Sequence, residues 1–160
     1  GRGSDLDLRR HRSRLTGATY LGFDYGRKHI GVAVGHGESR MAHALDTVSA
    51  RQERPDWDHI TRLIEEWRPS ALVVGLPLNM DDSENDMTRA AKKFGNRLQG
   101  RYNLPVHMVD ERLTSVMAKN TLQEAGVRYQ RRGPNIDKLA AQAILQAFLD
   151  ERDTRHAPDH

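Results

Sequence analysis

The segment YLGFDYGRKHIGVAVG, residues 20–35, constrains the fold more than any other part of the chain. It contains two apolar stretches, rich in β-branched or aromatic residues and flanked by glycines, on either side of the polar turn DYGRKH. This pattern is typical of two strands joined in a hairpin. The first stretch ends at Asp24, so the hairpin places one carboxylate at the carboxyl end of its first strand.

Helical and strand-like patterns alternate through the rest of the chain. A third strand is expected near residues 44–48, and two more in the segments ALVVG and LPVHMVD, the first of which is wholly apolar like a strand buried on both faces. The spacing of apolar residues predicts four helices: from Pro55 to Pro69, after a cap at Ser83, from about Thr114 to Ala125, and from Pro134 to about Asp150. The sequence therefore predicts an α/β layer around a mixed sheet.

The length of 160 residues suits a single domain, which we expect over residues 17–152. Cysteine is absent, which excludes disulfides and thiolate metal sites and favours the reducing cytoplasm. No apolar segment is long enough for a signal peptide or a membrane span, so no membrane association is expected. Residues 153–160 are expected to form a flexible tail.

Residues 1–16 account for the whole net charge of +3, because they hold five arginines and two aspartates. This composition predicts a basic arm that is disordered in isolation. Two interpretations of the arm are open. It can help to hold nucleic acid through the phosphates, or it is a solubilising tail whose GRGS start is a remnant of an expression vector.

Three acidic positions are candidates for one catalytic site. Asp24 ends the first strand, Glu111 follows the strand LPVHMVD, and Asp137 lies in the first turn of the last helix. In open α/β sheets, sites gather beyond the carboxyl ends of the strands. The last helix must lie on the sheet because of its apolar stripe, which comprises Ile136, Leu139, Ala140, Ala143, Ile144, Ala147 and Phe148. Three carboxylates brought together would repel one another without a divalent cation, and oxygen ligands of this kind suit Mg²⁺ or Mn²⁺.

Each acid also has a structural explanation. Asp24 can be an ordinary turn residue, and Glu111 can simply pair with Arg112 or with a neighbouring helix. Asp137 near a helix N-terminus is favoured by the helix dipole alone. The prediction of a catalytic site therefore depends on the convergence of all three acids.

Basic residues lie near each of these acids in the sequence. They are Arg27 and Lys28 after the first acid, Arg112 after the second, and Arg128, Arg131, Arg132 and Lys138 around the third. Such cations would hold the backbone of an anionic polymer, although arginine-rich loops are also common on solvated surfaces. The histidines have no partners at metal-ligand spacing and are assigned no role.

Four motifs occur in a specific order: LGFDYGRKHIGVAVG, VVGLPLNMDDSEND, LPVHMVDERLTS and NIDKLAAQAILQAFLD. In this order and spacing, from about Thr19 to Asp150, they resemble the YqgF family of bacteria, also called RuvX-like proteins, which are described as pre-16S rRNA nucleases or Holliday-junction-resolvase-like proteins. The resemblance implies an RNase H-like fold. Its five-stranded mixed sheet would have a three-strand meander followed by two parallel strands, flanked by helices.

The resemblance also implies roles for individual residues. The family's catalytic and metal-binding acids correspond to Asp24, Glu111 and Asp137, the same three acids as above. Two glycines of its first motif correspond to Gly26 and Gly31, which would let the backbone turn tightly beneath the site. The polar positions that would contact substrate or brace the acids correspond to Asn79, Arg112, Thr114 and Ser115, with Asp110 in a supporting position.

The chain departs from the family pattern after GLPLNMD, where the family often has glycines and this chain has Asp82 and Asn85. Both residues suit turns, so the departure concerns the shape of that loop and not the fold. The acids of the loop, Asp81, Asp82, Glu84 and Asp86, are expected to cap the helix that follows.

The leading hypothesis is a metal-dependent endonuclease, a hydrolase acting on ester bonds, that processes the 5′ end of precursor 16S rRNA with Mg²⁺ or Mn²⁺. The alternatives are a Holliday junction resolvase on branched DNA and a non-catalytic nucleic-acid-binding factor in ribosome assembly or transcription. An ATPase of the actin-like and sugar-kinase type is disfavoured, because 160 residues leave no room for its second domain. The expected partners are nucleic acid and the ribosomal particle, and the chain is expected to be a monomer or a weak homodimer.

Overall fold

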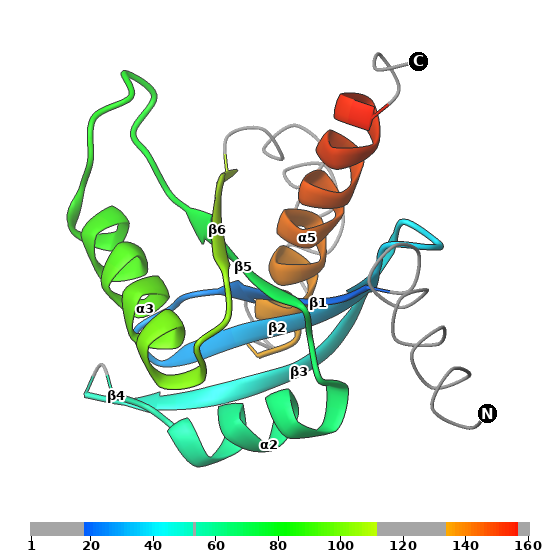
Figure 1. Cartoon of the computed structure of the whole chain (residues 1–160). Coiled ribbons are helices and arrows are strands. Elements are labelled where there is room, and N and C mark those ends of the chain that lie inside the picture. Colours follow the sequence, from blue (N-terminus) through cyan, green and yellow to red (C-terminus); the bar gives the residue numbers. More distant parts are fainter. Residues whose placement is uncertain (1–17, 53, 112–133, 157–160) are drawn as a thin grey trace.

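The computed structural model describes residues 18–52, 54–111 and 134–156. Six strands form one mixed sheet in the order β4-β3-β2-β1-β5-β6 (Figure 1). Neighbours from β1 to β4 pair antiparallel, whereas β5 runs parallel to β1 and β6 parallel to β5. The carboxyl ends of β1, β5 and β6 therefore lie at one edge of the sheet. The strands are β1 Thr19–Asp24, β2 His29–His36, β3 Met41–Arg51, β4 Arg54–Pro55, β5 Ala71–Leu76 and β6 Val106–Asp110.

Helices cover both faces of the sheet. Helix α5, Pro134–His156, lies on one face, and α2, Trp57–Trp67, and α3, Asp86–Tyr102, lie on the other (Figure 1). Each face has its own buried core. Successive side chains of β1 point to opposite faces of the sheet, so Phe23 points towards α2 and α3 and Tyr20 points towards α5.

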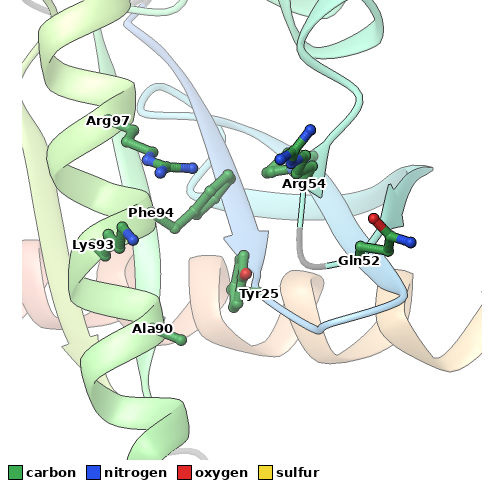
Figure 2. Close-up of a pocket in the computed structure, with 8 residues that line it drawn as sticks. Tyr25, Gln52, Arg54, Ala90, Lys93, Phe94 and Arg97 are labelled. Atoms are coloured by element: carbon green, nitrogen blue, oxygen red, sulfur yellow. The ribbon is translucent and has the colours of Figure 1, made fainter.

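The same alternation separates the two residues at the end of β1. Asp24 shares the face of Tyr20, which is the face that α5 covers. Tyr25 packs on the opposite face against Phe94 of α3, with ring centroids 5.1 Å apart (Figure 2). The end of β1 therefore presents a carboxylate to one side of the sheet and an aromatic ring to the other.

Close packing of α5 depends on glycines in the strands beneath it. A Cβ atom added at Gly22 of β1 would lie 2.8 Å from Cβ of Leu145, and one added at Gly35 of β2 would lie 2.9 Å from Cδ2 of the same leucine. Both distances are shorter than van der Waals contact. These two positions thus let the buried Leu145 side chain rest directly on the backbone of the sheet.

The mixed α/β sheet predicted from the sequence is confirmed, with two differences in its strands. The sheet has six strands instead of five, because the two-residue strand β4 pairs with the end of β3. Strand β3 extends well beyond the expected residues 44–48, because residues 41–49 pair with β2 and the last two residues of the strand pair with β4.

Two predicted ends of helices were wrong. The helix expected after a cap at Ser83 begins at Asp86 and is capped by Asn85, whose side chain accepts a hydrogen bond from the backbone N–H of Thr88. Helix α5 continues through His156, whereas its end was expected at about Asp150.

Several predicted features lie outside the described residues: the basic arm over residues 1–16, the helix from about Thr114 to Ala125, and the tail over residues 157–160. Among the helices that the structure describes, none combines the length and the apolar character needed to cross a bilayer.

The start of α3 is fixed to the end of β5 by a buried threonine. Thr88 is fully buried, and its hydroxyl donates a hydrogen bond to the carbonyl oxygen of Pro77. The same hydroxyl accepts a hydrogen bond from the backbone N–H of Asn85 at 3.0 Å. This capping arrangement connects the helix to the loop that leaves the sheet edge.

Thr88→Val is expected to lower the free energy of unfolding by about 1–3 kcal/mol, because valine leaves the Pro77 carbonyl and the Asn85 N–H without this partner in a buried place. The matched control is Thr61→Val, which removes the hydrogen bond, 2.8 Å long, between Thr61 and Tyr102 in a half-buried place. That control is expected to cost about 1 kcal/mol. Urea denaturation measures both, and equal losses in the two variants would contradict the role given to Thr88.

Candidate nuclease site

Asp24 and Glu111 meet at the carboxyl edge of the sheet. Asp24 is the last residue of β1, and Glu111 directly follows β6, which lies on the far side of β5. The two side chains share a hydrogen bond that raises the pKa of Asp24 and lowers that of Glu111. The hydrogen bond therefore favours the neutral form of Asp24 and the ionised form of Glu111.

Gly75 of β5 makes room for Glu111 between these two strands. A Cβ atom at Gly75 would lie 2.6 Å from Oε1 of Glu111 and 2.4 Å from Cδ1 of Ile144. The glutamate therefore rests directly on the β5 backbone, with α5 beside it. Any larger residue at position 75 would push the carboxylate away from Asp24.

Asp137 reaches the same edge through Gly31. In the register of β1 and β2, Gly31 lies opposite Asp24. A Cβ atom at Gly31 would lie only 1.8 Å from the carbonyl oxygen of Asp137. The first turn of α5 therefore packs on the backbone of β2 next to Asp24, and the charge of Asp137 is among the causes that raise the pKa of Asp24.

All three carboxyl groups have pKa values above their ordinary range, and burial is the largest cause for each. The charges of Glu111 and Asp137 raise the pKa of Asp24 further, and the charge of Asp110 raises that of Glu111. For Asp137, the nearby His29 acts in the opposite direction and lowers the pKa. The site therefore holds more carboxyl groups than it can ionise without added positive charge.

Asp24→Asn is expected to make the metal-free protein more stable at neutral pH. The folded state keeps a proton on Asp24 that the unfolded chain releases above its pKa of about 3.9. The stability contributed by this group therefore falls as the pH rises, by up to about 1.4 kcal/mol per pH unit. Asparagine can still donate to Glu111, and it does not carry this penalty.

The measurement is the free energy of unfolding in chelator from pH 3.5 to 8. The two proteins should be equally stable near pH 3.5, and the variant should gain over the wild type as the pH rises. A gain that is constant over this range, or a loss at pH 8, would show that ionisation of Asp24 is not penalised in the folded state.

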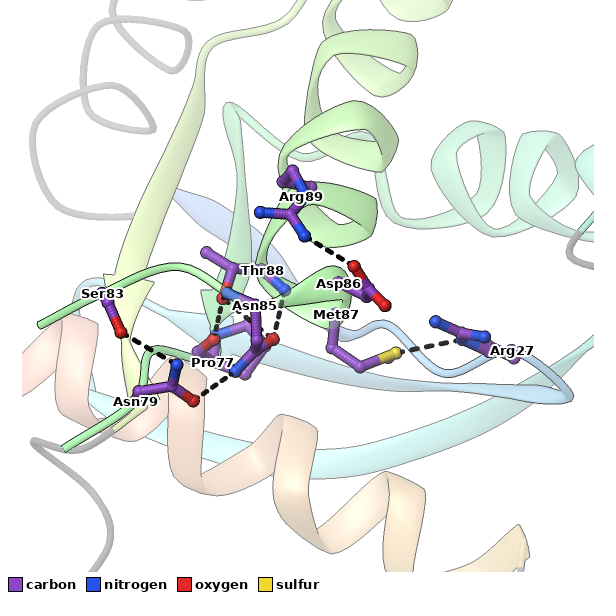
Figure 3. Close-up of polar contacts among 9 residues, drawn as sticks. All are labelled: Arg27, Pro77, Asn79, Ser83, Asn85, Asp86, Met87, Thr88 and Arg89. Atoms are coloured by element: carbon purple, nitrogen blue, oxygen red, sulfur yellow. Dashed lines mark hydrogen bonds and ion pairs between the residues drawn. The ribbon is translucent and has the colours of Figure 1, made fainter. Parts of the chain in front are cut away.

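Asn79 lies in the loop between β5 and α3, where it braces the loop itself. Its side-chain amide donates to Oγ of Ser83 and its Oδ1 accepts from the side-chain amide of Asn85, both at 2.9 Å (Figure 3). Its backbone N–H donates to the Ser83 carbonyl, also at 2.9 Å. Both ends of the Asn79 side chain are thus engaged in the loop, and its predicted contact with substrate stays a prediction.

The loop acids expected to cap α3 divide into different roles. Asp86 lies in the first turn of α3 and pairs with Arg89 at 2.5 Å (Figure 3). Asp81 instead accepts a hydrogen bond from the backbone N–H of Ser83 at 3.0 Å, within the loop. Glu84 pairs with Lys92 at 2.5 Å.

The predicted substrate-binding cations are only partly within the described residues. Arg27 and Lys28 are exposed in the loop between β1 and β2, and Nε of Arg27 lies 3.3 Å from Sδ of Met87 on α3. Lys138 is half-buried next to Asp137. The remaining predicted contacts lie outside the described residues: Arg112, Thr114, Ser115, Arg131 and Arg132.

The two glycines that were assigned to tight turns have different roles. Gly26 lies in the loop between β1 and β2, where a Cβ atom would come within 2.4 Å of the carbonyl oxygen of His29. Gly31 was wrongly assigned, because it lies inside β2 and not in a turn. Its role is the close approach of α5, which the local turn pattern could not reveal.

Sequence reasoning missed two residues next to the acids. His29 acts on the pKa of Asp137, although the histidines were assigned no role. Gly75 carries the Glu111 side chain. A glycine inside the otherwise apolar run ALVVG was the one available signal, since glycine within a strand often marks a close approach.

Comparisons with known proteins agree with this architecture. The family model described as "RuvX: Holliday junction resolvase" matches residues 18–151. A relative from Nitrosococcus oceani named "Putative pre-16S rRNA nuclease" is 51% identical over 138 residues, covering 85% of this chain and 90% of the relative. A relative of the same name from Chromohalobacter salexigens is 51% identical over 129 residues, covering 81% of this chain and 87% of the relative.

Among solved structures, Thermus thermophilus RuvC in complex with a Holliday junction substrate resembles this chain with a TM-score of 0.53 at 16% identity. The match covers 86% of this chain and 96% of that chain, and it shows a shared fold. The family match extends over nearly all of the described sheet and helices and includes all three acids. The chain therefore belongs to the RuvX family, also called YqgF.

Proposed function

We propose that this protein is a metal-dependent endonuclease that processes the 5′ end of precursor 16S rRNA. The observation that carries the proposal is the meeting of Asp24, Glu111 and Asp137 at the carboxyl edge of the sheet. The names of relatives that are about half identical over most of the chain support the choice of substrate. Such processing would take place in the cytoplasm.

The chemistry of the three acids fits a hard divalent cation such as Mg²⁺ or Mn²⁺. The pKa values of all three carboxyl groups are raised, because the groups are buried close to one another. A bound cation would supply the positive charge that lets them ionise together. Within the described residues, no three His, Cys, Asp or Glu side chains already form a ligand group. The hydrogen bond between Asp24 and Glu111 favours the neutral form of Asp24, so a cation that binds there would have to displace a proton.

Asp24 and Asp137 are the residues that would hold the ion, and Glu111 would complete the set or orient the attacking water. A bound Mg²⁺ or Mn²⁺ would supply Lewis-acid activation of the scissile phosphate. The exposed Arg27 and Lys28 would neutralise neighbouring phosphates. Water would attack phosphorus in line with the departing oxygen.

Cations beyond the described residues are proposed to share the task of binding phosphate. They are Arg112, Arg131 and Arg132, together with the described Lys138; Asn79, Thr114 and Ser115 complete the proposed substrate contacts.

A second candidate is resolution of branched DNA, which is favoured by the description of the family model and by the RuvC-like fold. A resolvase makes paired, symmetric cuts and therefore acts as a dimer. The rRNA nuclease needs no such symmetry, so a monomer or a weak homodimer suits it. A third candidate uses the same fold only to bind nucleic acid.

The test uses the full chain with two labelled substrates, a 16S precursor RNA, free or within the ribosomal particle, and a four-way DNA junction. Each is incubated with Mg²⁺, Mn²⁺ or chelator. Metal-dependent cleavage of the RNA at one position near the mature 5′ end is expected. Paired cuts in the junction alone would favour the resolvase, and RNA binding in chelator without cleavage in any metal would favour the non-catalytic factor.

A further inference from the structure

A cavity of about 240 Å³ opens on the face of the sheet opposite the three acids. It lies between the middle of α3 and the turn that joins β3 to β4 (Figure 2). Its lining includes Tyr25 and Phe94, together with Arg54, Lys93 and Arg97. The lining within the described part of the chain is thus aromatic and cationic, without an acidic side chain.

The side chains of the three cations have no partner among the described residues. Those of Arg54, Lys93 and Arg97 form no hydrogen bond or ion pair with another described residue. Other cations of α3 do have partners, since Arg89 pairs with Asp86 and Lys92 pairs with Glu84. Arg101 lies over the Trp57 ring, 4.1 Å from its centroid. Among the described residues, the cations of α3 whose side chains have no partner are therefore those that line the cavity.

The aromatic residues form the other part of the lining. Phe94 is buried, with 2% of its surface exposed, and it forms a floor. Tyr25 lies on it with ring centroids 5.1 Å apart and remains half-buried, so part of the tyrosine ring stays accessible (Figure 2). Aromatic rings beside cations are the combination that binds single-stranded nucleic acid, by stacking of bases and by attraction of phosphates.

The cavity and the three acids share one edge of the sheet. Tyr25 directly follows Asp24 in the sequence, and the two residues face opposite sides. The end of β3 lies at the same edge, because the backbone N–H of Ala50 donates to the carbonyl of Lys28 at 2.8 Å. The exposed Arg27 and Lys28 therefore lie in the loop that directly follows Asp24 and Tyr25, beside the end of β3.

We propose that this cavity binds a phosphate and its neighbouring nucleotide in a single-stranded segment of the RNA that leads away from the cleaved bond. The proposal rests on the proposed nuclease function for the identity of the polymer. The volume of about 240 Å³ is below the roughly 300–1,000 Å³ of pockets for whole drug-sized ligands. It therefore suits a single nucleotide within a chain better than a free dinucleotide.

The test measures binding of a 5′-labelled single-stranded RNA dodecamer by fluorescence anisotropy, with the full chain in chelator at 50 to 200 mM salt. Arg97→Gln and the double variant Lys93→Gln/Arg97→Gln are compared with Arg62→Gln. Arg62 is an exposed cation of α2 that does not line the cavity, and within the described residues it has no partner. Arginine and glutamine have similar helix propensities, so all three variants should fold like the wild type.

Loss of one phosphate contact on a single strand lowers the slope of log affinity against log salt by about 0.7. Arg97→Gln should therefore weaken binding about eightfold at 50 mM salt and about threefold at 200 mM. The double variant should lower the slope by about 1.4, and Arg62→Gln should leave it unchanged. Cavity variants that bind RNA no more weakly than Arg62→Gln would overturn the proposal.

A second measurement distinguishes a site for an RNA strand from a site for a free phosphate ion. The thermal midpoint of each variant is measured with inorganic phosphate at millimolar concentration. Loss of stabilisation by phosphate with unchanged RNA affinity would mean a small-anion site and would overturn the proposal. Because binding is measured without metal, absence of cleavage by the wild type would count against the nuclease and not against this RNA site.

Discussion

Replacing Asp24 by asparagine is expected to reduce metal-dependent cleavage of precursor RNA on the order of 10³-fold or more, while the protein stays folded. Asp24 lies close to both other acids, since the negative charges of Glu111 and Asp137 each raise its pKa. An amide keeps the shape of the side chain and its hydrogen bond to Glu111, but it cannot carry the negative charge that a divalent cation needs.

The measurement is single-turnover cleavage with Mn²⁺ in excess, together with circular dichroism to confirm folding. The matched control is Asp110→Asn, which removes a neighbouring carboxylate at the same edge of the sheet and keeps both Asp24 and Glu111, although the charge of Asp110 also raises the pKa of Glu111. This control is expected to reduce cleavage by no more than about 10- to 100-fold, as for residues that support a metal ligand without binding the metal. Wild-type cleavage by folded Asp24→Asn would refute the assignment of the acids.

Gly31→Ala is expected to lower the free energy of unfolding by about 3 kcal/mol and to reduce cleavage by 100-fold or more. The added methyl group would lie 1.8 Å from a backbone oxygen of α5, which cannot move aside as a flexible side chain could. The first turn of α5 must therefore shift, and Asp137 shifts with it. A displacement of about 1 Å at a catalytic group is enough for a loss of this size.

The matched control is Gly100→Ala on α3, because an added Cβ there meets no atom within 4 Å. This control is expected to raise the free energy of unfolding by up to about 1 kcal/mol, since alanine is the better helix former, and to leave cleavage unchanged. Urea denaturation and single-turnover cleavage measure both variants. If Gly31→Ala behaved like Gly100→Ala, α5 could not be resting on the β2 backbone as described.

The order of elements and the edge of the sheet that carries the acids could be predicted from local patterns. Asp24 and Glu111 each follow a run of strand residues, and parallel strands around one central strand bring their carboxyl ends together. Asp137 could be placed because its helix had to lie on the sheet. Local patterns therefore predicted that the three acids converge. They did not predict the close contacts at Gly31 and Gly75 that hold the acids in place.

The face that α5 turns to the sheet could not be predicted in detail. Its buried side chains are Ala141, Ile144, Leu145, Phe148 and Leu149, whereas the predicted stripe included Leu139, Ala140, Ala143 and Ala147, which are half-buried. The helix is apolar over so much of its circumference that spacing alone leaves its rotation open. The glycines of the strands select the rotation, and that information lies more than 60 residues away in the sequence.

The cationic cavity could not be predicted for a similar reason. Arg54 belongs to the short strand β4, while Lys93 and Arg97 belong to α3, and only the pairing of β3 with β4 brings them to one place. In the sequence each of these residues is indistinguishable from a solvated surface cation.

Binding of Mn²⁺ at pH 8 decides whether the three acids form a metal site, and it is measured on the purified protein by isothermal calorimetry and by the shift of the thermal midpoint. If Asp24, Glu111 and Asp137 act together as a metal site, wild type should bind Mn²⁺ and gain about 2.7 kcal/mol of stability at 100 times the dissociation constant. Asp24→Asn should lose most of that binding and that gain. Equal Mn²⁺ binding and equal stabilisation in the two proteins would contradict the claim that these three carboxylates form the catalytic centre.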